Sequence, residues 1–165
     1  MKKTLFRHIM VFVLCLNICI LLFAQPALAA SNTNTIYSNI EKFEDGSYII
    51  DEIVIIPNNT DFSLLTNTKS TTAVRNSIGY DSLGKKCWTF SLTATFQYNG
   101  SISKTQTASC NYTIHQNGWN CKSKNATYSG NTAKGSASFK CSTTTSNTTI
   151  GLKCSALGKI SNINY

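Results

Sequence analysis

Residues 87–98 read Cys87-Trp88-Thr89-Phe90-Ser91-Leu92-Thr93-Ala94-Thr95-Phe96-Gln97-Tyr98, and they decide the fold class. Large or apolar side chains alternate here with hydroxyl, amide and thiol side chains, without a break. A period of two places the apolar residues on one face of an extended chain and the polar residues on the other. The stretch therefore predicts a β-strand with one buried and one solvated face.

Similar segments follow at short intervals. Asn99-Gly100 predicts a turn, and residues 101–114 predict the returning strand. A further strand is expected from Trp119, a turn at 129–131, a strand that ends near Cys141 and a last strand over 148–154. No helical periodicity is present. The pattern predicts an all-β fold, an antiparallel β-sandwich that is immunoglobulin-like in general architecture, over residues 77–165.

The segment before this body predicts a smaller unit. Residues 40–44 and 47–56 are strand-like and flank Asp45-Gly46, which favours a hairpin with a type I′ turn. Residues 58–76 are rich in Asn, Thr and Ser, which is typical of a linker. We therefore expect residues 30–76 to form an acidic N-terminal segment with a hairpin and linker, and residues 77–165 to form a basic β-sandwich domain.

Residues 1–29 have the pattern of a secretory signal peptide. A basic start precedes an apolar run over residues 9–24, and Ala27-Leu28-Ala29 supplies a small-x-small cleavage site. The run is shorter than the roughly 20 apolar residues that a membrane span needs. We expect an exported protein with no membrane anchor after cleavage. The excess of Lys over Arg, with much Asn, Ile and Thr, indicates a low-GC Gram-positive source.

The charge changes sign along the chain. Residues 82–165 contain nine lysines and no Asp or Glu, whereas residues 30–81 contain all seven acids and three bases, Lys42, Lys69 and Arg75. The larger part of the chain therefore has no carboxylate chemistry of its own and is expected to face anionic partners.

Five cysteines remain after the signal peptide. In an oxidising compartment such cysteines usually pair, and an odd number leaves one over. Cys121 and Cys141 on one predicted hairpin are the first candidate pair, Cys87 and Cys110 lie diagonally on another, and Cys154 competes for Cys110. No Cys-x-x-Cys pair is present, which disfavours metal binding. The candidate disulfide cysteines are Cys87, Cys110, Cys121, Cys141 and Cys154.

Four stretches resemble a family of small secreted proteins of Gram-positive bacteria whose function is unknown. They are residues 43–50, 88–100, 129–133 and 152–154. The resemblance implies a β-rich exported domain, and it implies no catalytic residue.

Catalytic readings are weaker than structural ones. His115 is expected to be a surface histidine, because residues 82–165 hold no carboxylate to orient it and no Gly-x-Ser-x-Gly motif is present. No phosphate-binding or dinucleotide-binding motif suggests a cofactor. The carboxylates considered for glycoside cleavage lie in the predicted hairpin and are expected to be solvated, namely Glu41, Glu44, Asp45, Asp51 and Glu52. We predict that the protein is not an enzyme and binds neither metal nor cofactor.

The lysines suggest a binding function. Anionic extracellular partners would include a cell-wall polymer, an acidic glycan, an anionic lipid surface or released DNA, each held by salt-sensitive attraction. Solubility and protection of sheet edges explain such lysines equally. Lys122 and Lys124 are expected on one strand face, across a hairpin from Lys134 and Lys140. The candidate binding residues are Lys85, Lys86, Lys122, Lys124, Lys134, Lys140 and Lys153.

Three functional hypotheses follow. The first is a secreted, non-enzymatic β-domain that binds or coats an anionic surface such as the cell wall, with no specific nucleic acid. The second is a cationic antibacterial or toxin-like protein that an acidic pro-segment masks until proteolysis within residues 58–76. The third is an enzyme, and the missing carboxylates count against it.

Overall fold

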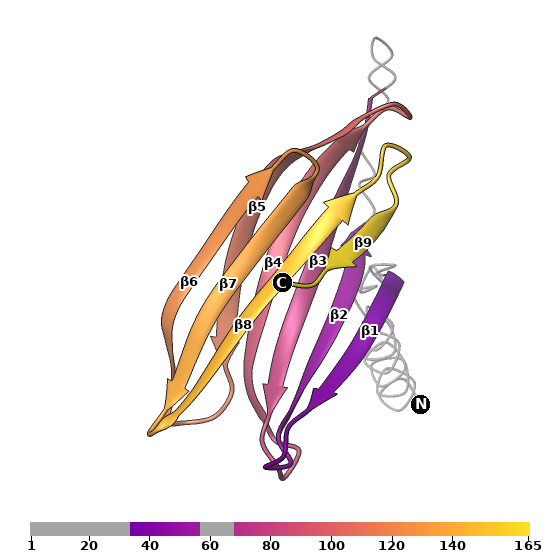
Figure 1. Cartoon of the computed structure of the whole chain (residues 1–165). Helices are drawn as coiled ribbons and strands as arrows, with labels where there is room; N and C mark the ends of the chain where they lie inside the picture. The colour runs from indigo at the N-terminus through magenta and orange to yellow at the C-terminus, as the bar shows by residue number, and fades with distance from the viewer. Residues whose placement is uncertain (1–33, 57–67) are drawn as a thin grey trace, which may run out of the picture. The chain divides into compact units, whose positions relative to one another are not determined.

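The computed structural model describes residues 34–56 and 68–165, which form an antiparallel β-sandwich (Figure 1). This confirms the predicted fold class. The first sheet has the order β1-β2-β3-β4-β5 and the second has the order β6-β7-β8-β9. The strands of the first sheet are β1 (Asn34–Lys42), β2 (Tyr48–Ile56), β3 (Lys69–Tyr80), β4 (Lys86–Tyr98) and β5 (Ser103–Ile114). Those of the second are β6 (Trp119–Ser129), β7 (Thr132–Cys141), β8 (Thr144–Cys154) and β9 (Ile160–Ile163).

The connectivity is simpler than that of an immunoglobulin domain. Each strand pairs with its neighbours in sequence, so each sheet is a meander, and the loop over residues 115–118 carries the chain from one sheet to the other. Immunoglobulin domains instead exchange strands between sheets through Greek-key connections. The fold therefore has the two packed sheets of an immunoglobulin domain but not its strand connectivity.

The core combines large side chains of β4 with small ones of β7. Trp88, Phe90 and Leu92 of β4 are buried, as their alternation predicted. A Cβ on Gly135 of β7 would lie 3.1 Å from the Phe90 ring and 3.3 Å from Leu92, so only a glycine fits under these side chains without displacement. The Trp88 indole stacks on Phe139 of β7, with 4.4 Å between ring centroids and 8° between planes.

The predicted linker and domain boundary are wrong over residues 69–76. These residues belong to β3, which pairs with β2 from Tyr48↔Tyr80 to Ile56↔Thr72 and with β4 on its other side. The N-terminal hairpin is therefore part of the first sheet, and the expected boundary at residue 77 falls inside a central strand. Residues 57–67, the rest of the predicted linker, lie outside the described residues.

β3 was not predicted from the sequence, because its buried face carries few apolar side chains. Inward positions of β3 hold Arg75, Ser77 and Gly79. A Cβ on Gly79 would come within 2.4 Å of the Trp88 indole, so the glycine makes room for the largest core side chain. Ser77 accepts a hydrogen bond at 3.0 Å from the Thr148 hydroxyl of β8. Hydrogen-bond partners on other strands satisfy these polar groups, and a search for apolar periodicity does not detect such partners.

Arg75 links the two sheets through its buried guanidinium. One nitrogen, Nη2, donates to Asp51 Oδ2 of β2 at 2.8 Å. The other, Nη1, donates to the carbonyl oxygens of Gly151 at 3.0 Å and Ile163 at 2.9 Å, in β8 and β9. Arg75 is 2% exposed, so its charge depends on these partners rather than on water.

Two further expectations need correction. The Asp45-Gly46 turn is not of type I′, which requires positive φ at both residues. Of the two, Gly46 alone has positive φ, 82°, and the loop covers residues 43–47 between the Lys42↔Tyr48 pair. The chain also has a strand after the predicted last one, because β9 returns along β8 with Cys154 opposite Ile160.

The predicted signal peptide, residues 1–29, lies outside the described residues. Within residues 34–56 and 68–165, no helix has the length and hydropathy needed to cross a membrane.

We predict that Arg75→Ala lowers the free energy of unfolding by about 3–5 kcal/mol. The substitution leaves the Asp51 carboxylate and the carbonyl groups of Gly151 and Ile163 without their cationic partner. Urea denaturation followed by tryptophan fluorescence measures this change. Lys69→Ala, at the exposed start of the same strand, is the matched control and should change stability by about 0.5 kcal/mol or less. Equal effects of the two substitutions would contradict the role of Arg75.

We also predict that residues 30–60 and 61–165, produced as two separate chains, associate and elute together in size-exclusion chromatography. β2 pairs with β3 over nine positions, and Ile53 of β2 is fully buried in the common core. Ile53→Asp in the short chain should abolish association. Two stable, independent pieces would instead support a removable pro-segment.

Candidate functional site

Three of the predicted binding lysines share the outer surface of the second sheet. On β7, Ala133, Ala137 and Phe139 point inward, and the alternation places Lys134 and Lys140 outward. Hydroxyl side chains occupy the outward positions between these two lysines. Lys153 of β8 lies opposite Thr132 and is exposed. We name Lys134, Lys140 and Lys153 the lysine face.

The C-terminal residue contributes to this face. The Tyr165 ring lies under Lys134, with the Lys134 Nζ 4.1 Å from the ring centroid. Gly151, opposite Lys134 in the register, leaves the space, since a Cβ there would lie 2.5 Å from the Tyr165 ring. Tyr165 was missed by the sequence analysis, because nothing in the local sequence of either residue predicts their contact.

The remaining candidate lysines do not lie on this face. Lys85 and Lys86 are exposed around the start of β4, in the first sheet. The register shifts between Cys121 and Ser123, so Lys124 pairs with the inward Ala137 and turns toward the first sheet. There its Nζ donates to the Cys110 carbonyl oxygen at 3.3 Å and lies 5.3 Å from the Tyr112 ring.

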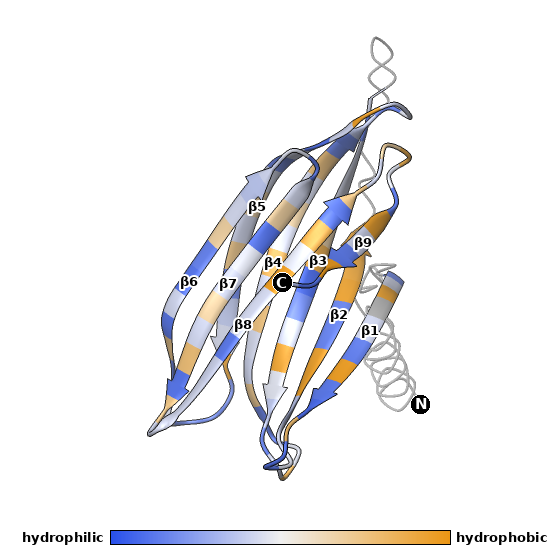
Figure 2. Cartoon of the chain, viewed as in Figure 1, coloured by the Kyte–Doolittle hydropathy of each residue, from blue (hydrophilic) through white to orange (hydrophobic). Residues whose placement is uncertain are grey.

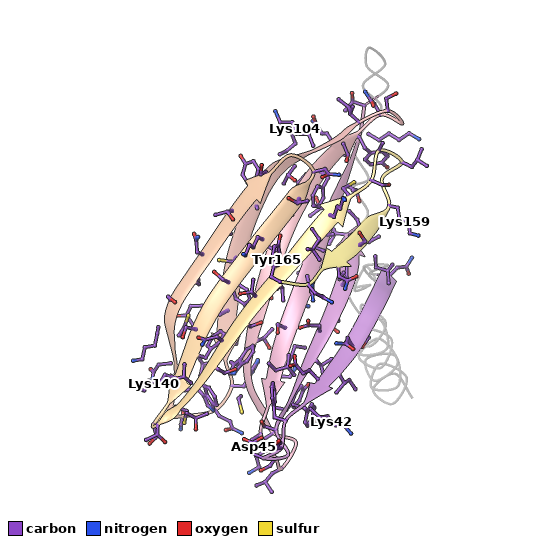
Figure 3. The ribbon with its side chains drawn as sticks, viewed as in Figure 1. Lys42, Asp45, Lys104, Lys140, Lys159 and Tyr165 are labelled. Carbon is purple, nitrogen blue, oxygen red and sulfur yellow. The ribbon has the colours of Figure 1, made fainter. Side chains whose placement is uncertain are left out.

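The prediction that Lys122 and Lys124 share a face, with Lys134 and Lys140 across the hairpin, is therefore wrong. Lys122 is exposed at the register shift. Figure 3 shows Lys140 near one end of the sandwich, and Lys104 and Lys159 near the other. Figure 2 shows mainly hydrophilic and neutral residues along β6 and β7, in contrast to the hydrophobic bands on β2. Lys134, Lys140 and Lys153 thus distribute positive charge over the outer surface of the second sheet instead of gathering it in one pocket.

A groove of about 480 Å³ opens at one end of the sandwich, between the two sheets. Its walls combine aromatic rings with hydroxyl and amide groups. Two of the rings, Tyr48 and Tyr80, stack with 4.7 Å between centroids. Side chains with these properties hold small ligands in many proteins. The lining includes Phe43, Tyr48, Tyr80, Trp88, Trp119 and residues 144–147.

The charged groups that line the groove are acidic. The Asp45 carboxylate accepts hydrogen bonds from the side chain and backbone of Ser47, which lower the pKa of Asp45. The Asp81 carboxylate accepts from the Gln116 side chain and from the backbone of Lys85 and Leu83, and these bonds lower the pKa of Asp81. Two ionised carboxylates make the groove unfavourable for an anion.

Of the other residues considered for catalysis, Asp51, Glu52 and His115 have side-chain partners. Asp51 binds Arg75 inside the sandwich, whereas Glu52 accepts a hydrogen bond from Asn76 on the outer surface at 2.8 Å. These two carboxylates therefore point to opposite faces of one sheet. His115 is exposed, and its Nε2 lies 3.0 Å from the Thr89 hydroxyl oxygen.

All five cysteines in the described part of the chain are thiols in the structure. The register opposes the pairs favoured by the sequence. Leu92 lies opposite Cys110 and Trp88 opposite Ile114, which separates Cys87 from Cys110 by roughly 16 Å along the strands. Cys121 lies opposite Phe139, and Cys141 opposite Trp119. Cys121 and Cys141 are thus diagonal neighbours at roughly 7–8 Å, beyond the usual Cα separation for a disulfide.

Cys154 is also remote from Cys110. The Ser103 hydroxyl, at the start of β5, donates to the Cys154 carbonyl oxygen at 2.6 Å. Cys110 is seven residues further along β5, a distance of roughly 20 Å. Among the described residues, no group of three or more His, Cys, Asp or Glu side chains is arranged to hold a metal ion.

Comparison with known proteins does not assign a function. No protein-family model matches the chain, and no curated protein matches it in sequence. Among solved structures, a hypothetical protein of Listeria monocytogenes is similar to it, with a TM-score of 0.41 and 15% identity. The alignment covers 77% of this chain and 92% of that protein.

We predict that Asp81→Asn makes the free energy of unfolding less dependent on pH in the acidic range. Because the folded-state pKa of Asp81 is lowered, its ionised carboxylate stabilises the fold above the unfolded pKa of about 3.9, and this contribution is lost as the pH falls through the folded value. The difference in urea midpoint between the wild type and Asp81→Asn should be larger at pH 6 than at pH 2.5. A difference that is equal at both pH values would contradict this role.

Proposed function

We propose that this chain is an exported, non-enzymatic binding module that attaches to an anionic polymer of an extracellular surface, such as the cell wall. The observation that carries the proposal is the lysine face: Lys134, Lys140 and Lys153 project from one sheet surface. Residues 82–165 contain no Asp or Glu side chain that could neutralise them. An unbalanced charge of this kind attracts a polyanion over the length of the sheet.

The neighbours of these lysines support the same role. Outward positions of β7 and β8 between the lysines hold Ser136, Ser138 and Thr149, which offer hydroxyl groups for hydrogen bonds to phosphate or sugar oxygens. A flat surface with distributed charge suits an extended polymer better than a small ligand. Salt should weaken such binding strongly, because the charges are exposed and screened.

The carboxylates of the first sheet support a non-enzymatic role. Asp51 neutralises Arg75, and Glu52 accepts from Asn76. Asp45 and Asp81 close turns through hydrogen bonds to the backbone. Each of these four groups therefore has a structural task in the first sheet.

We predict that the triple variant Lys134→Gln, Lys140→Gln, Lys153→Gln weakens binding to immobilised polyglycerol phosphate about 100-fold at low salt, at about 1 kcal/mol per lysine. Binding is measured by biolayer interferometry over a series of salt concentrations, and the variant should also show a shallower salt dependence.

The matched control removes three exposed lysines of the first sheet, Lys42, Lys69 and Lys104, by the same substitution. Net charge then changes equally in both variants. Strong binding by the control, with loss in the lysine-face variant, supports the proposal. Equal loss in both would show that net charge alone matters, and no binding by the wild type at low salt would refute the proposal.

A further inference from the structure

Cys87 and Cys141 lie at the same level of the sandwich, on opposite sheets. The backbone carbonyl of Cys87 accepts from the amides of His115 at 2.9 Å and Gln116 at 3.3 Å, so Cys87 adjoins the loop that joins the sheets. Cys141 adjoins the same loop, because its Sγ would lie 3.4 Å from a Cβ on Gly118. This loop brings together two cysteines that are 54 positions apart in the sequence.

The electrostatics of Cys87 agree with this placement. Burial is the main cause that raises the pKa of the Cys87 thiol, and the Asp81 carboxylate and the Cys141 thiol add to it. Trp88, next to Cys87, stacks on Phe139, two residues before Cys141. The strand ends that carry the two thiols are therefore packed against each other across the core.

Cys110 of β5 and Cys121 of β6 both lie on the inner faces of their sheets, one step further into the sandwich. Cys121 lies opposite Phe139, whose ring meets the Tyr112 ring edge-on with 6.1 Å between centroids. Tyr112 is two residues from Cys110, on the same face of β5. Lys124, three residues after Cys121, donates to the Cys110 carbonyl oxygen.

The pKa of the Cys121 thiol reports the same neighbour. Burial is the main cause that raises this pKa, Lys124 and a backbone hydrogen bond at Ser123 oppose it, and the Cys110 thiol adds to the increase. Burial raises the pKa of the Cys154 thiol, and no other cysteine contributes to that increase. It lies by Ser103 and Asn131, which both donate to its carbonyl oxygen.

We propose that the exported protein contains two disulfides between the sheets, Cys87–Cys141 and Cys110–Cys121, and that Cys154 stays a buried free thiol. Each bridge forms by thiol–disulfide exchange with an oxidised dithiol or small-molecule disulfide outside the cell. One thiolate attacks the donor disulfide, and the second thiolate then displaces the donor thiol from the mixed disulfide. For each bridge the two protein thiols transfer two electrons and two protons to the donor disulfide, which leaves as two thiols.

The bridges would fasten the second sheet to the first along one side. β4 would be joined to β7, and β5 to β6, where the main chain passes between sheets only through residues 115–118. The Cys87–Cys141 bridge closes the longer loop of the chain, so it should restrict the unfolded state more than Cys110–Cys121.

Trypsin digestion of the unreduced exported protein, residues 30–165, which contains five cysteines, distinguishes this pairing from the alternatives. The protein is refolded with reduced and oxidised glutathione, denatured, alkylated and digested, and the peptides are identified by mass spectrometry. Cleavage after lysine places Cys110 and Cys121 in one peptide, residues 105–122, whereas Cys87 falls in residues 87–104 and Cys141 in residues 141–153.

The proposal requires three products. Residues 87–104 should be linked to residues 141–153, residues 105–122 should be lighter by two hydrogen atoms and unlinked, and residues 154–159 should carry alkylated Cys154. Either other pairing of the four cysteines joins all three large peptides into one cluster, which would overturn the proposal. Full alkylation of all five cysteines without reduction, or a disulfide at Cys154, would also overturn it.

Two variants separate bridge formation from folding. Cys154→Ala should retain both bridges, whereas Cys141→Ala should leave Cys87 open to alkylation and keep the internal bridge of residues 105–122. Reduction should lower the urea midpoint of the wild type and of Cys154→Ala, and should lower that of Cys141→Ala less. A midpoint that reduction leaves unchanged in the wild type would contradict any role of the bridges in stability.

Discussion

The buried guanidinium of Arg75 sets the constraint on which the rest of the fold depends. A cation that is 2% exposed needs partners, and it takes them from both sheets: Asp51 of β2 and the backbone carbonyls of Gly151 and Ile163. Breaking such a pair is costly, because the remaining charge stays buried. The early hairpin and the last strand must therefore be in place together. Through these contacts Arg75 joins β2, β8 and β9 within a single β-sandwich, although the composition of the sequence suggests two parts.

The contacts of Arg75 also change how the separation of acidic and basic residues along the sequence is interpreted. Three acids of the N-terminal half stabilise the fold, since Asp51 pairs with Arg75, and Asp45 and Asp81 accept hydrogen bonds that close turns at the groove. They are built into the first sheet, so an acidic segment that shields the lysines and then leaves would take core strands with it. The contrast between halves of the sequence becomes a contrast between sheets. Every acid among the described residues lies in or beside the strands of the first sheet, and the described second sheet, which presents the lysine face, contains no Asp or Glu.

Prediction from sequence succeeded where one face of a strand is continuously apolar and failed where other forces bury a strand. The alternation over residues 87–98 gave β4 and the sandwich architecture. β3 was missed because Arg75, Ser77 and Gly79 occupy its inner face, and each is explained only by a partner on another strand. Lys124 was misplaced because an extra residue at the register shift reverses the strand face, which a strict period of two does not anticipate. The contact between Lys134 and Tyr165 depends on tertiary structure alone.

The inner faces of the two sheets explain why covalent bonds would matter here. β7 supplies mostly small side chains, such as Ala133, Gly135 and Ala137, and the bulk of that part of the core comes from β4. The larger apolar side chains that the second sheet contributes to the core are Phe139 at the end of β7 and Ile150 and Leu152 of β8, while its outer surface carries lysines and hydroxyl groups. Hydrophobic stabilisation scales with buried apolar area, so the small inner residues of β7 gain less from packing than the large ones of β4. Two bridges along β4–β7 and β5–β6 would compensate for this at the side where the sheets share only one loop, and would hold the lysine face in place outside the cell.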